Sequence, residues 1–350
     1  MFWNKPRARR DKYFDELVEG FSGTDSVITQ NDNLLLAKSE SFEFEIYWKD
    51  SSNFNSRIIP IQTEIALRCS SRKVDDSFLN LSRELKGDEG RRIEALMLLN
   101  KLASLGSMYV QNEKIYYGSR FTLYEGDSDA VFERVCKPLL ASSIIHAGND
   151  LLLYAFARNL STGVPPSKDS LWTQTDFDQM KKWLDPKCIC TAGSDGLSAQ
   201  FELKILGDLE NVSTKILDRI ITVAPMRKKK NTAMFTAEVS HHPILGGGLL
   251  LLLQMPYVIE DRAKLALICS ELNKLEMSSE VETQFFGKED NAQHFGAWTE
   301  GGLGGNLSYV SFIPNSLHKL GLGLNMSFWF MKRAQVADPL ILELLNLNIN

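Results

Sequence analysis

Two adjacent histidines are the residues of this chain whose types most readily suggest acid–base chemistry. His241 and His242 follow a strand-like segment that carries Glu238, and a general base needs such a partner within hydrogen-bond reach. Neighbouring residues of an extended segment point to opposite faces, so the two histidines are not expected to bind one metal ion together. We interpret the segment as a hairpin loop. If the chain holds a catalytic site, His241 or His242 with Glu238 are its first candidates.

No other arrangement of polar residues predicts a metal, cofactor or nucleophile site. Cys188-Ile189-Cys190 is a single close cysteine pair, whereas structural zinc needs about four ligands, usually from two such pairs. The run Gly301–Gly305 lacks the Lys-Ser/Thr of a phosphate loop and leads into a strand, so it is interpreted as a hairpin turn. The sequence has no Gly-x-Ser-x-Gly, no His-Glu-x-x-His and no GxGxxG after a strand. It therefore predicts no catalytic residues, no cofactor and no metal.

Two short basic runs provide the candidate binding residues. Residues 1–10 are interpreted as a solvated basic arm, and residues 227–230 as a loop between strands. Either run could contact phosphates or an acidic partner. The net charge of −5 and the absence of interleaved aromatic residues make nucleic acid the alternative partner rather than the first one. The candidate residues are Arg7, Arg9, Arg10, Arg227, Lys228, Lys229 and Lys230.

The composition is that of a soluble globular protein long enough for two domains, with 350 residues, 44% hydrophobic and 24% charged. Five scattered cysteines, an odd number, indicate a reducing compartment rather than a disulfide framework. Met1-Phe2-Trp3 is followed at once by basic residues, so no signal peptide is expected. The longest apolar stretches, Gly246–Met255 and Leu320–Met331, are shorter than the roughly 20 residues of a membrane helix. We therefore expect a cytoplasmic protein without a membrane span.

The spacing of apolar residues divides the N-terminal half into helices and strands. Apolar residues recur at helical spacing from Asp11 to Phe21, while residues 42–48 alternate between apolar and polar as a half-covered strand does. The same patterns predict further helices at 89–105 and from 127 or 128 to 144. Further strands are expected at 34–37, 58–69, 108–110, 115–117 and 121–124.

The second half follows a linker that contains Gly163-Val164-Pro165-Pro166-Ser167. A short helix near 175–184 and a hairpin of 188–191 with 199–205 are assigned to an insertion. Beyond it we expect helices at 208–217, 265–275 and 317–328, and strands at 220–224, 233–239, 248–254, 294–299 and 307–312. Pro339 is expected to end the last helix. The predicted organisation is an arm 1–10, a module 11–160, a linker and insertion 161–207, a second module 208–338 and an apolar tail 339–350.

The two halves have the same predicted order of elements, namely helix, three strands, helix, two strands and helix. Their central helices end in Asn100-Lys101-Leu102 and Asn273-Lys274-Leu275. This α+β order, with antiparallel sheets, resembles the small module of type III secretion chaperones and the related YbjN-type domain. The resemblance implies protein binding, commonly as dimers, without cofactor or catalytic residues. The second copy departs from it by extra residues at Glu276–Asn291.

We therefore expect a non-enzymatic protein-binding adaptor or chaperone in which two tandem modules form a pseudo-dimer within one chain. Its binding surfaces would be exposed sheet faces or edges and the apolar C-terminal tail. The first alternative is a nucleic-acid-associated or regulatory protein that uses residues 1–10 and the loop 227–230. A third alternative is an enzyme whose site lies between the repeats, which would need convergent titratable groups in a cleft.

Overall fold

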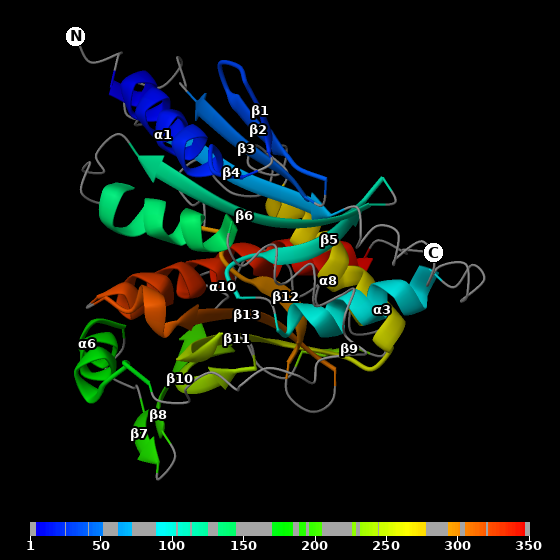
Figure 1. Ribbon diagram of the computed structural model, residues 1–350. Coiled ribbons are helices and arrows are strands. Elements are labelled where there is room, and N and C mark those ends of the chain that lie inside the picture. Colours follow the sequence, from blue (N-terminus) through cyan, green and yellow to red (C-terminus); the bar gives the residue numbers. More distant parts are fainter. Residues whose placement is uncertain are drawn as a thin grey trace, which may run out of the picture.

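The structure, a computed structural model, is an α+β protein with two antiparallel sheets and helices packed on and between them (Figure 1). It describes residues 5–24, 26–40, 42–51, 62–71, 89–102, 104–112, 114–124, 132–144, 170–184, 189–193, 196–204, 226–228, 232–243, 245–277, 293–301, 305–319 and 321–346. The α+β class and the antiparallel strand pairing predicted from the sequence are confirmed.

The first sheet has six strands in the order β1-β2-β3-β4-β6-β5. The strands are β1 Val27–Gln30, β2 Leu34–Lys38, β3 Phe42–Ser51, β4 Gln62–Ser71, β5 Ser107–Gln111 and β6 Lys114–Tyr124. Leu35 and Ala37 of β2 are buried and their neighbours are more exposed, which is the alternation of a strand with one covered face. The helices of this half are α1 (Lys5–Phe21), α3 (Glu89–Asn100) and residues 132–144, which open as the π-helix η1 (Phe132–Cys136).

The second sheet has the path β12-β13-β11-β10-β8-β7, and β9 also pairs with β11. The strands are β7 Ile189–Gly193, β8 Gly196–Lys204, β9 Met226–Lys228, β10 Thr232–His242, β11 Gly246–Ile259, β12 Ala297–Gly301 and β13 Asn306–Pro314. The helices of this half are α6 (Gln174–Leu184), α8 (Arg262–Met277), the short 3-10 turn η3 (Asn315–Leu317) and α10 (Leu322–Asn346). Chain order is therefore helix, strands, helix, hairpin and helix in both halves.

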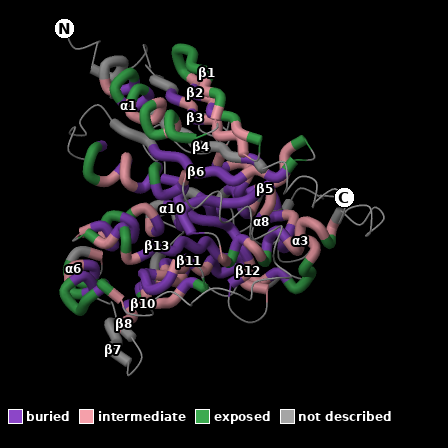
Figure 2. The backbone as a smooth tube through the Cα atoms, in the orientation of Figure 1, coloured by how far each residue is buried: buried purple, intermediate pink, exposed green. Residues whose placement is uncertain are grey.

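One hydrophobic core joins the two sheets, and α10 lies between them (Figure 1). Trp329 of α10 packs edge-on against Phe121 of β6, with ring centroids 5.6 Å apart. The next residue, Phe330, lies 5.1 Å from the ring of Tyr309 in β13. Figure 2 shows that burial is continuous through this central region, whereas α1 and α6 keep exposed outer faces. Consecutive residues of a single helix thus contact both sheets.

Most predicted elements are present, but three expectations about the first half need correction. A fourth strand, β1, precedes the expected three, because its short sequence Val-Ile-Thr-Gln has no alternation to detect. The strands expected at 115–117 and 121–124 are one continuous strand, β6. The expected arm is helical from Lys5 onward, since α1 begins there. The helix expected at 208–217 and the strand at 220–224 lie outside the described residues.

The expected C-terminal apolar tail is instead the last part of α10. The helix runs through position 339 to Asn346, although proline removes one backbone hydrogen bond. Leu340, Ile341 and Leu344 are buried in the core, and Asp338 accepts a hydrogen bond from the hydroxyl of Tyr257. Burial of three large side chains outweighs the missing bond, so Pro339 does not end the helix. These leucines are core residues rather than an exposed binding surface.

The hairpin that was assigned to an insertion belongs to the second sheet. Strand β8 pairs with β10, placing Phe201 opposite Phe235 and Ala199 opposite Ala237. All four side chains are buried, and the two phenylalanine rings stack with centroids 5.5 Å apart. The hairpin is therefore part of the core of this half.

Candidate functional site

The two histidines expected to suit acid–base chemistry lie at the end of a hairpin, where His242 has a structural role. His241 and His242 end β10 and lie opposite Gly247 and Gly246 of β11, so the expected hairpin is confirmed. His242 is buried, whereas His241 is half-buried. The Nε2 atom of His242 lies 2.7 Å from the carbonyl oxygen of Leu102, in the other half of the chain.

The hydrogen bonds of His242 define a neutral imidazole that carries its proton on Nε2. That N–H donates to the Leu102 carbonyl, and Nδ1 accepts the backbone N–H of Leu245 at 3.1 Å. Burial lowers the pKa of His242, which agrees with the neutral form. Since both ring nitrogens are bonded to backbone groups, His242 is not available to act as a base with Glu238.

The candidate basic residues of the N-terminal segment lie on a packed helix rather than on an arm. Arg10 is 9% exposed, and its guanidinium donates to Asp11 Oδ1 at 2.8 Å and to Asn33 Oδ1 at 3.4 Å. The Arg9 guanidinium carbon lies 5.6 Å from the centre of the Phe132 ring, a cation–π distance. Arg7 is also within α1, although its side chain lies outside what the structure describes. Arg10 therefore helps to pack α1.

The second basic run is only partly described. Arg227 and Lys228 belong to β9, where they pair with Val258 and Tyr257 of β11. Lys229 and Lys230 lie outside the described residues. In Figure 1, β9 and α1 are well separated, so these two runs do not converge on one surface.

The cysteine and glycine runs form strand ends and a turn. Cys190 lies in β7 opposite Ala199 of β8, and Cys188 is outside the described residues. Gly301 pairs with Asn306 across the β12–β13 connection, and Gly305 has a φ of 76°, which confirms the hairpin turn expected there. Among the described residues, no group of three histidine, cysteine or acidic side chains could hold a metal ion.

A buried network of hydrogen-bonded side chains, which sequence reasoning did not single out, connects both halves. We call it the Glu276 network; its members are Glu276 of α8, His294, Trp298 of β12, Tyr309 of β13, Arg333 of α10 and Ser107 of β5. Arg333 binds Glu276 through two parallel hydrogen bonds, Nε to Oε1 at 2.8 Å and Nη2 to Oε2 at 2.9 Å. The indole N–H of Trp298 donates to Glu276 Oε1 at 2.9 Å. The Arg333 guanidinium also stacks 3.9 Å from the centre of the Tyr309 ring.

Three members of the Glu276 network are connected like a serine hydrolase triad. Ser107 Oγ lies 2.8 Å from His294 Nε2, and His294 Nδ1 lies 3.2 Å from Glu276 Oε2. Burial lowers the pKa of His294, although Glu276 partly opposes this shift. A neutral His294 that donates from Nδ1 to Glu276 would accept the Ser107 hydroxyl proton on Nε2, as a general base does.

The surroundings of these three residues do not allow the triad chemistry. Ser107 and His294 are fully buried, and Glu276 is 3% exposed. The pocket near Arg134 and the pocket near Glu202 include none of the three. Glu276 is already neutralised by Arg333, which holds its pKa well below the usual range although burial alone would raise it. Among the described residues, the titratable groups of the network converge in the core rather than at a pocket, and we assign the network a structural role.

Little in the sequence pointed to this network, because its members are far apart along the chain. Asn100 and Asn273, the asparagines of the two Asn-Lys-Leu segments, each make a similar pair of hydrogen bonds to the strand that follows. Asn100 Nδ2 donates to the Met108 carbonyl at 2.9 Å, and Asn100 Oδ1 accepts the Met108 N–H at 2.8 Å. Asn273 makes the same two bonds with Trp298, at 3.0 and 2.7 Å. Each asparagine is buried and fixes the helix end to the strand that follows it.

The strands that these asparagines hold are also alike in register. Met108 lies opposite Tyr117, and Trp298 lies opposite Tyr309. A glycine directly precedes each of these strands, Gly106 before β5 and Gly296 before β12, and the ring of the tyrosine lies against it. A Cβ atom on Gly106 would lie 2.7 Å from Tyr117 Cζ, and one on Gly296 would lie 3.0 Å from Tyr309 Cζ. The same Cβ atoms would lie 2.6 Å from the Gly118 carbonyl oxygen and 2.3 Å from the Val310 carbonyl oxygen, and these backbone contacts are too close for a side chain at either place.

Backbone hydrogen bonds and helix packing join the two halves. The N–H of Arg120 donates to the His294 carbonyl at 3.0 Å, and the N–H of Phe312 donates to the Ser104 carbonyl at 3.0 Å. Helix α3 packs against α8, and each of them contacts the hairpin of the other half, α3 with β12 and α8 with β5.

Comparison with protein-family models, with curated proteins and with solved structures gave no significant match. Within the described residues, no helix is long and apolar enough to cross a membrane. A function for this chain therefore has to follow from its own geometry.

The buried histidines lead to an expected dependence of stability on pH. Burial lowers the pKa of both His242 and His294 below the value of 6.5, so the unfolded chain binds more protons than the folded chain below that pH. The contribution of the two neutral histidines to the free energy of unfolding is complete above pH 6.5, and it is lost as the pH falls toward their lowered pKa values in the folded chain. Between pH 7.5 and 5.5 we expect a loss of up to about 1.4 kcal/mol for each histidine.

Urea unfolding at pH 7.5, 6.5 and 5.5 measures this loss. His242→Gln is the matched variant, because it removes one of the two titrating groups and should show about half of the pH-dependent change. Equal free energies of unfolding for the unaltered chain at pH 7.5 and 5.5 would contradict the prediction.

Proposed function

We propose that this chain is a non-enzymatic protein-binding adaptor or chaperone built as an intrachain pseudo-dimer of two chaperone-like modules. The observation that carries the proposal is the equivalence between the halves in strand order and in the hydrogen bonds of Asn100 and Asn273. A duplicated module that pairs with itself, and whose convergent polar residues are buried, favours a binding scaffold over a catalyst.

The strand orders of the two sheets support the duplication. With β9 left aside, each half has six strands, which can be matched one to one in chain order, β1 with β7 and so on to β6 with β13. The first sheet has the path β1-β2-β3-β4-β6-β5, and the matched strands of the second sheet have the path β7-β8-β10-β11-β13-β12, which is the same order. In this correspondence α6 is the counterpart of α1, and α8 of α3. We therefore infer that the second module begins at α6 and that the hairpin β7–β8 is its own first hairpin rather than an insertion between modules.

The reciprocal contacts support the pseudo-dimer. If Met108 corresponds to Trp298 and Tyr117 to Tyr309, then Arg120 corresponds to Phe312. Counting back two residues from Gly106 and Gly296, Ser104 corresponds to His294. The backbone bond from Arg120 N–H to the His294 carbonyl and the one from Phe312 N–H to the Ser104 carbonyl are then the same contact made twice, and the N–H of His294 also donates to the Arg120 carbonyl at 2.8 Å. A C2 dimer makes each of its contacts twice in this way.

An uncharged sheet edge is the best candidate for the partner surface. Strand β1 lies at the end of the first sheet and has β2 as its one neighbour within the described residues. Its sequence Val-Ile-Thr-Gln contains neither a charged residue nor proline, which are the residues that usually protect an edge from pairing. Val27 is 71% exposed. An extended partner segment would add to this edge by main-chain hydrogen bonds.

The proposal is tested by placing a charged residue on strand β1 and measuring which partner proteins the chain still binds. Affinity purification with the full chain as bait identifies partners, and Val27→Lys is expected to reduce their recovery at least fivefold. Leu171→Lys is the matched control, because Leu171 is also an exposed apolar residue, 55% exposed, but lies just before α6 in the other half. Hydrogen exchange on the purified complex should show protection of residues 27–30.

Two outcomes would contradict the proposal. One is equal recovery of the same partners by Val27→Lys and Leu171→Lys at equal thermal stability. The other is recovery of no partner together with turnover of a small molecule, which would favour the enzyme alternative.

A further inference from the structure

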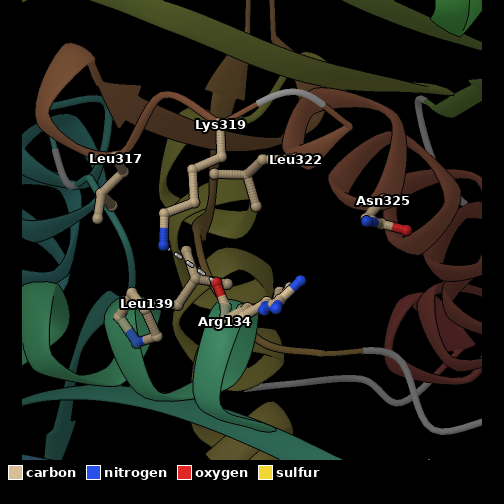
Figure 3. Close-up of a pocket in the computed structure, with 8 residues that line it drawn as sticks. Arg134, Leu139, Leu317, Lys319, Leu322 and Asn325 are labelled. Carbon is tan, nitrogen blue, oxygen red and sulfur yellow. Dashed lines mark hydrogen bonds between the residues drawn. The ribbon is translucent and has the colours of Figure 1, made fainter. Parts of the chain in front are cut away.

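An apolar pocket of about 220 Å³ lies where the two halves meet at one end of α10 (Figure 3). One side is formed by residues 134–139, at the junction of η1 and the helix that follows it. The opposite side is formed by residues 317–325, which run from η3 into the first turn of α10. Figure 3 shows these two segments facing each other, with the side chains that line the pocket between them. The pocket is distant in sequence from Val27 and strand β1, the edge that the binding proposal uses.

The walls of the pocket are hydrocarbon. Its apolar lining residues are Val135, Pro138, Leu139, Leu317 and Leu322. Leu139, Leu317 and Leu322 are buried, and they belong to the core or border it, so these walls are fixed by packing. A ligand that fills the pocket must therefore have an apolar part.

Two cations without carboxylate partners lie at the same pocket. Arg134 and Lys319 are exposed, and neither forms an ion pair within the described part of the chain. The ammonium group of Lys319 reaches across the pocket to the carbonyl oxygen of Arg134, at 3.4 Å (Figure 3). None of the described lining residues is acidic. A buried or half-buried apolar space beside two unpaired cations is complementary to an anion with an apolar tail.

The nearest acidic residue along the chain does not satisfy these cations. Glu133 precedes Arg134, but its carboxylate receives Lys12 at 3.0 Å and Lys137 at 3.0 Å. The hydrogen bond from Lys12, followed by that from Lys137, lowers the pKa of Glu133. The positive end of the α10 dipole adds to the field at the pocket, because the first turn of that helix contains no acidic residue. The local charge balance therefore remains positive.

We propose that this pocket binds a small amphiphilic monocarboxylate, with the apolar tail between Leu139 and Leu322 and the carboxylate between Arg134 and Lys319. The pocket volume equals about seven water-sized volumes of about 30 Å³, so a ligand of roughly that many non-hydrogen atoms fits inside. Such a group could come from a free short-chain acid or from the apolar C-terminal residue of a polypeptide. The two sources share the same chemistry at the pocket and differ in what extends outside it.

The test uses the full chain and hexanoate as the probe. Methyl NMR signals of Val135, Leu139, Leu317 and Leu322 should shift on titration with hexanoate, with a dissociation constant of about 0.1–1 mM for a ligand of this size. Hexanamide has the same shape without the charge and is expected to bind at least fivefold more weakly. Acetate has the charge without the tail and should give no saturable shift. N-acetyl-leucine represents the chain end, and tighter binding than hexanoate would assign the polypeptide source.

Charge removal distinguishes the pocket from non-specific binding. Arg134→Gln and Lys319→Gln should each weaken hexanoate binding at least threefold. Lys181→Gln removes the same charge from an exposed position on α6 and should leave binding unchanged. The proposal is overturned if the methyl signals at the pocket do not shift, if hexanamide binds as well as hexanoate, or if the three variants behave alike. Because the test needs no protein partner, its result is independent of the proposed adaptor function.

Discussion

Replacing Arg333 with methionine is expected to lower the free energy of unfolding by about 3–5 kcal/mol, because the change leaves the buried carboxylate of Glu276 without its cation. Glu276 is 3% exposed and Arg333 is 1% exposed, so water cannot take the place of the lost guanidinium. Arg333 supplies two hydrogen bonds to this carboxylate. Methionine keeps much of the apolar stem of arginine, so the loss reports on charge more than on volume.

The double variant Glu276→Gln with Arg333→Met separates the unpaired charge from the lost contacts. A glutamine amide oxygen can still accept the indole N–H of Trp298, the bond that Glu276 Oε1 accepts at 2.9 Å. With no charge left in the network, the double variant should be more stable than Arg333→Met alone by about 1–3 kcal/mol. Urea unfolding of the two single variants and the double variant forms the cycle that measures this coupling.

A surface ion pair provides the control for this prediction. Lys12 and Glu133 are 3.0 Å apart, but their side chains are 64% and 39% exposed. Lys12→Met is expected to cost less than about 1 kcal/mol, since exposed pairs contribute little. A cost below about 1 kcal/mol for Arg333→Met as well would show that the Glu276 network is not a structural ion pair of the kind we describe.

The contrast between the helices and the Glu276 network shows what the sequence could predict. Helix α8 and strand β10 were predicted because their apolar residues recur at fixed spacing, and spacing is a local property. Glu276 and Arg333 come into contact only when α8 and α10 pack together. The spacing of apolar residues within one helix does not predict a contact between two helices. Ser107 and His294 are separated still further along the chain. Convergent residues of this kind follow from the tertiary fold.

Two of the errors also have physical causes. Proline is a strong local signal for the end of a helix, yet α10 continues past Pro339 because the following leucines and isoleucine are buried. Arg10 was grouped with the basic residues around it, but its place in α1 directs it toward Asn33. In both cases tertiary packing overrides a preference that is correct for an isolated segment. Both asparagines of the Asn-Lys-Leu pattern make a pair of hydrogen bonds to the strand that follows, and the duplication inferred from the pattern stays a prediction.

The asparagines of that pattern give the second large expected effect. Asn100→Asp and Asn273→Asp should each lower the free energy of unfolding by about 3–5 kcal/mol at pH 7. Each amide nitrogen now donates to a backbone carbonyl, that of Met108 or Trp298. An aspartate places an oxygen there instead, so two acceptors would face each other and a buried charge would lack a partner. The two costs are expected to agree within about 1 kcal/mol, because the two sites have the same geometry.

The pH dependence of these variants distinguishes a buried charge from simple loss of packing. A buried aspartate has a raised pKa, and its protonated form can donate to the carbonyl as asparagine does. The destabilisation relative to the unaltered chain should therefore grow as the pH rises above the unfolded value of about 3.9 and should shrink in acid. Asn325→Asp, at an exposed position in the first turn of α10, is the control and should change stability by less than about 0.5 kcal/mol. If one of the two aspartate variants is strongly destabilised and the other is not, the two asparagines are not equivalent and the inferred duplication loses its main support.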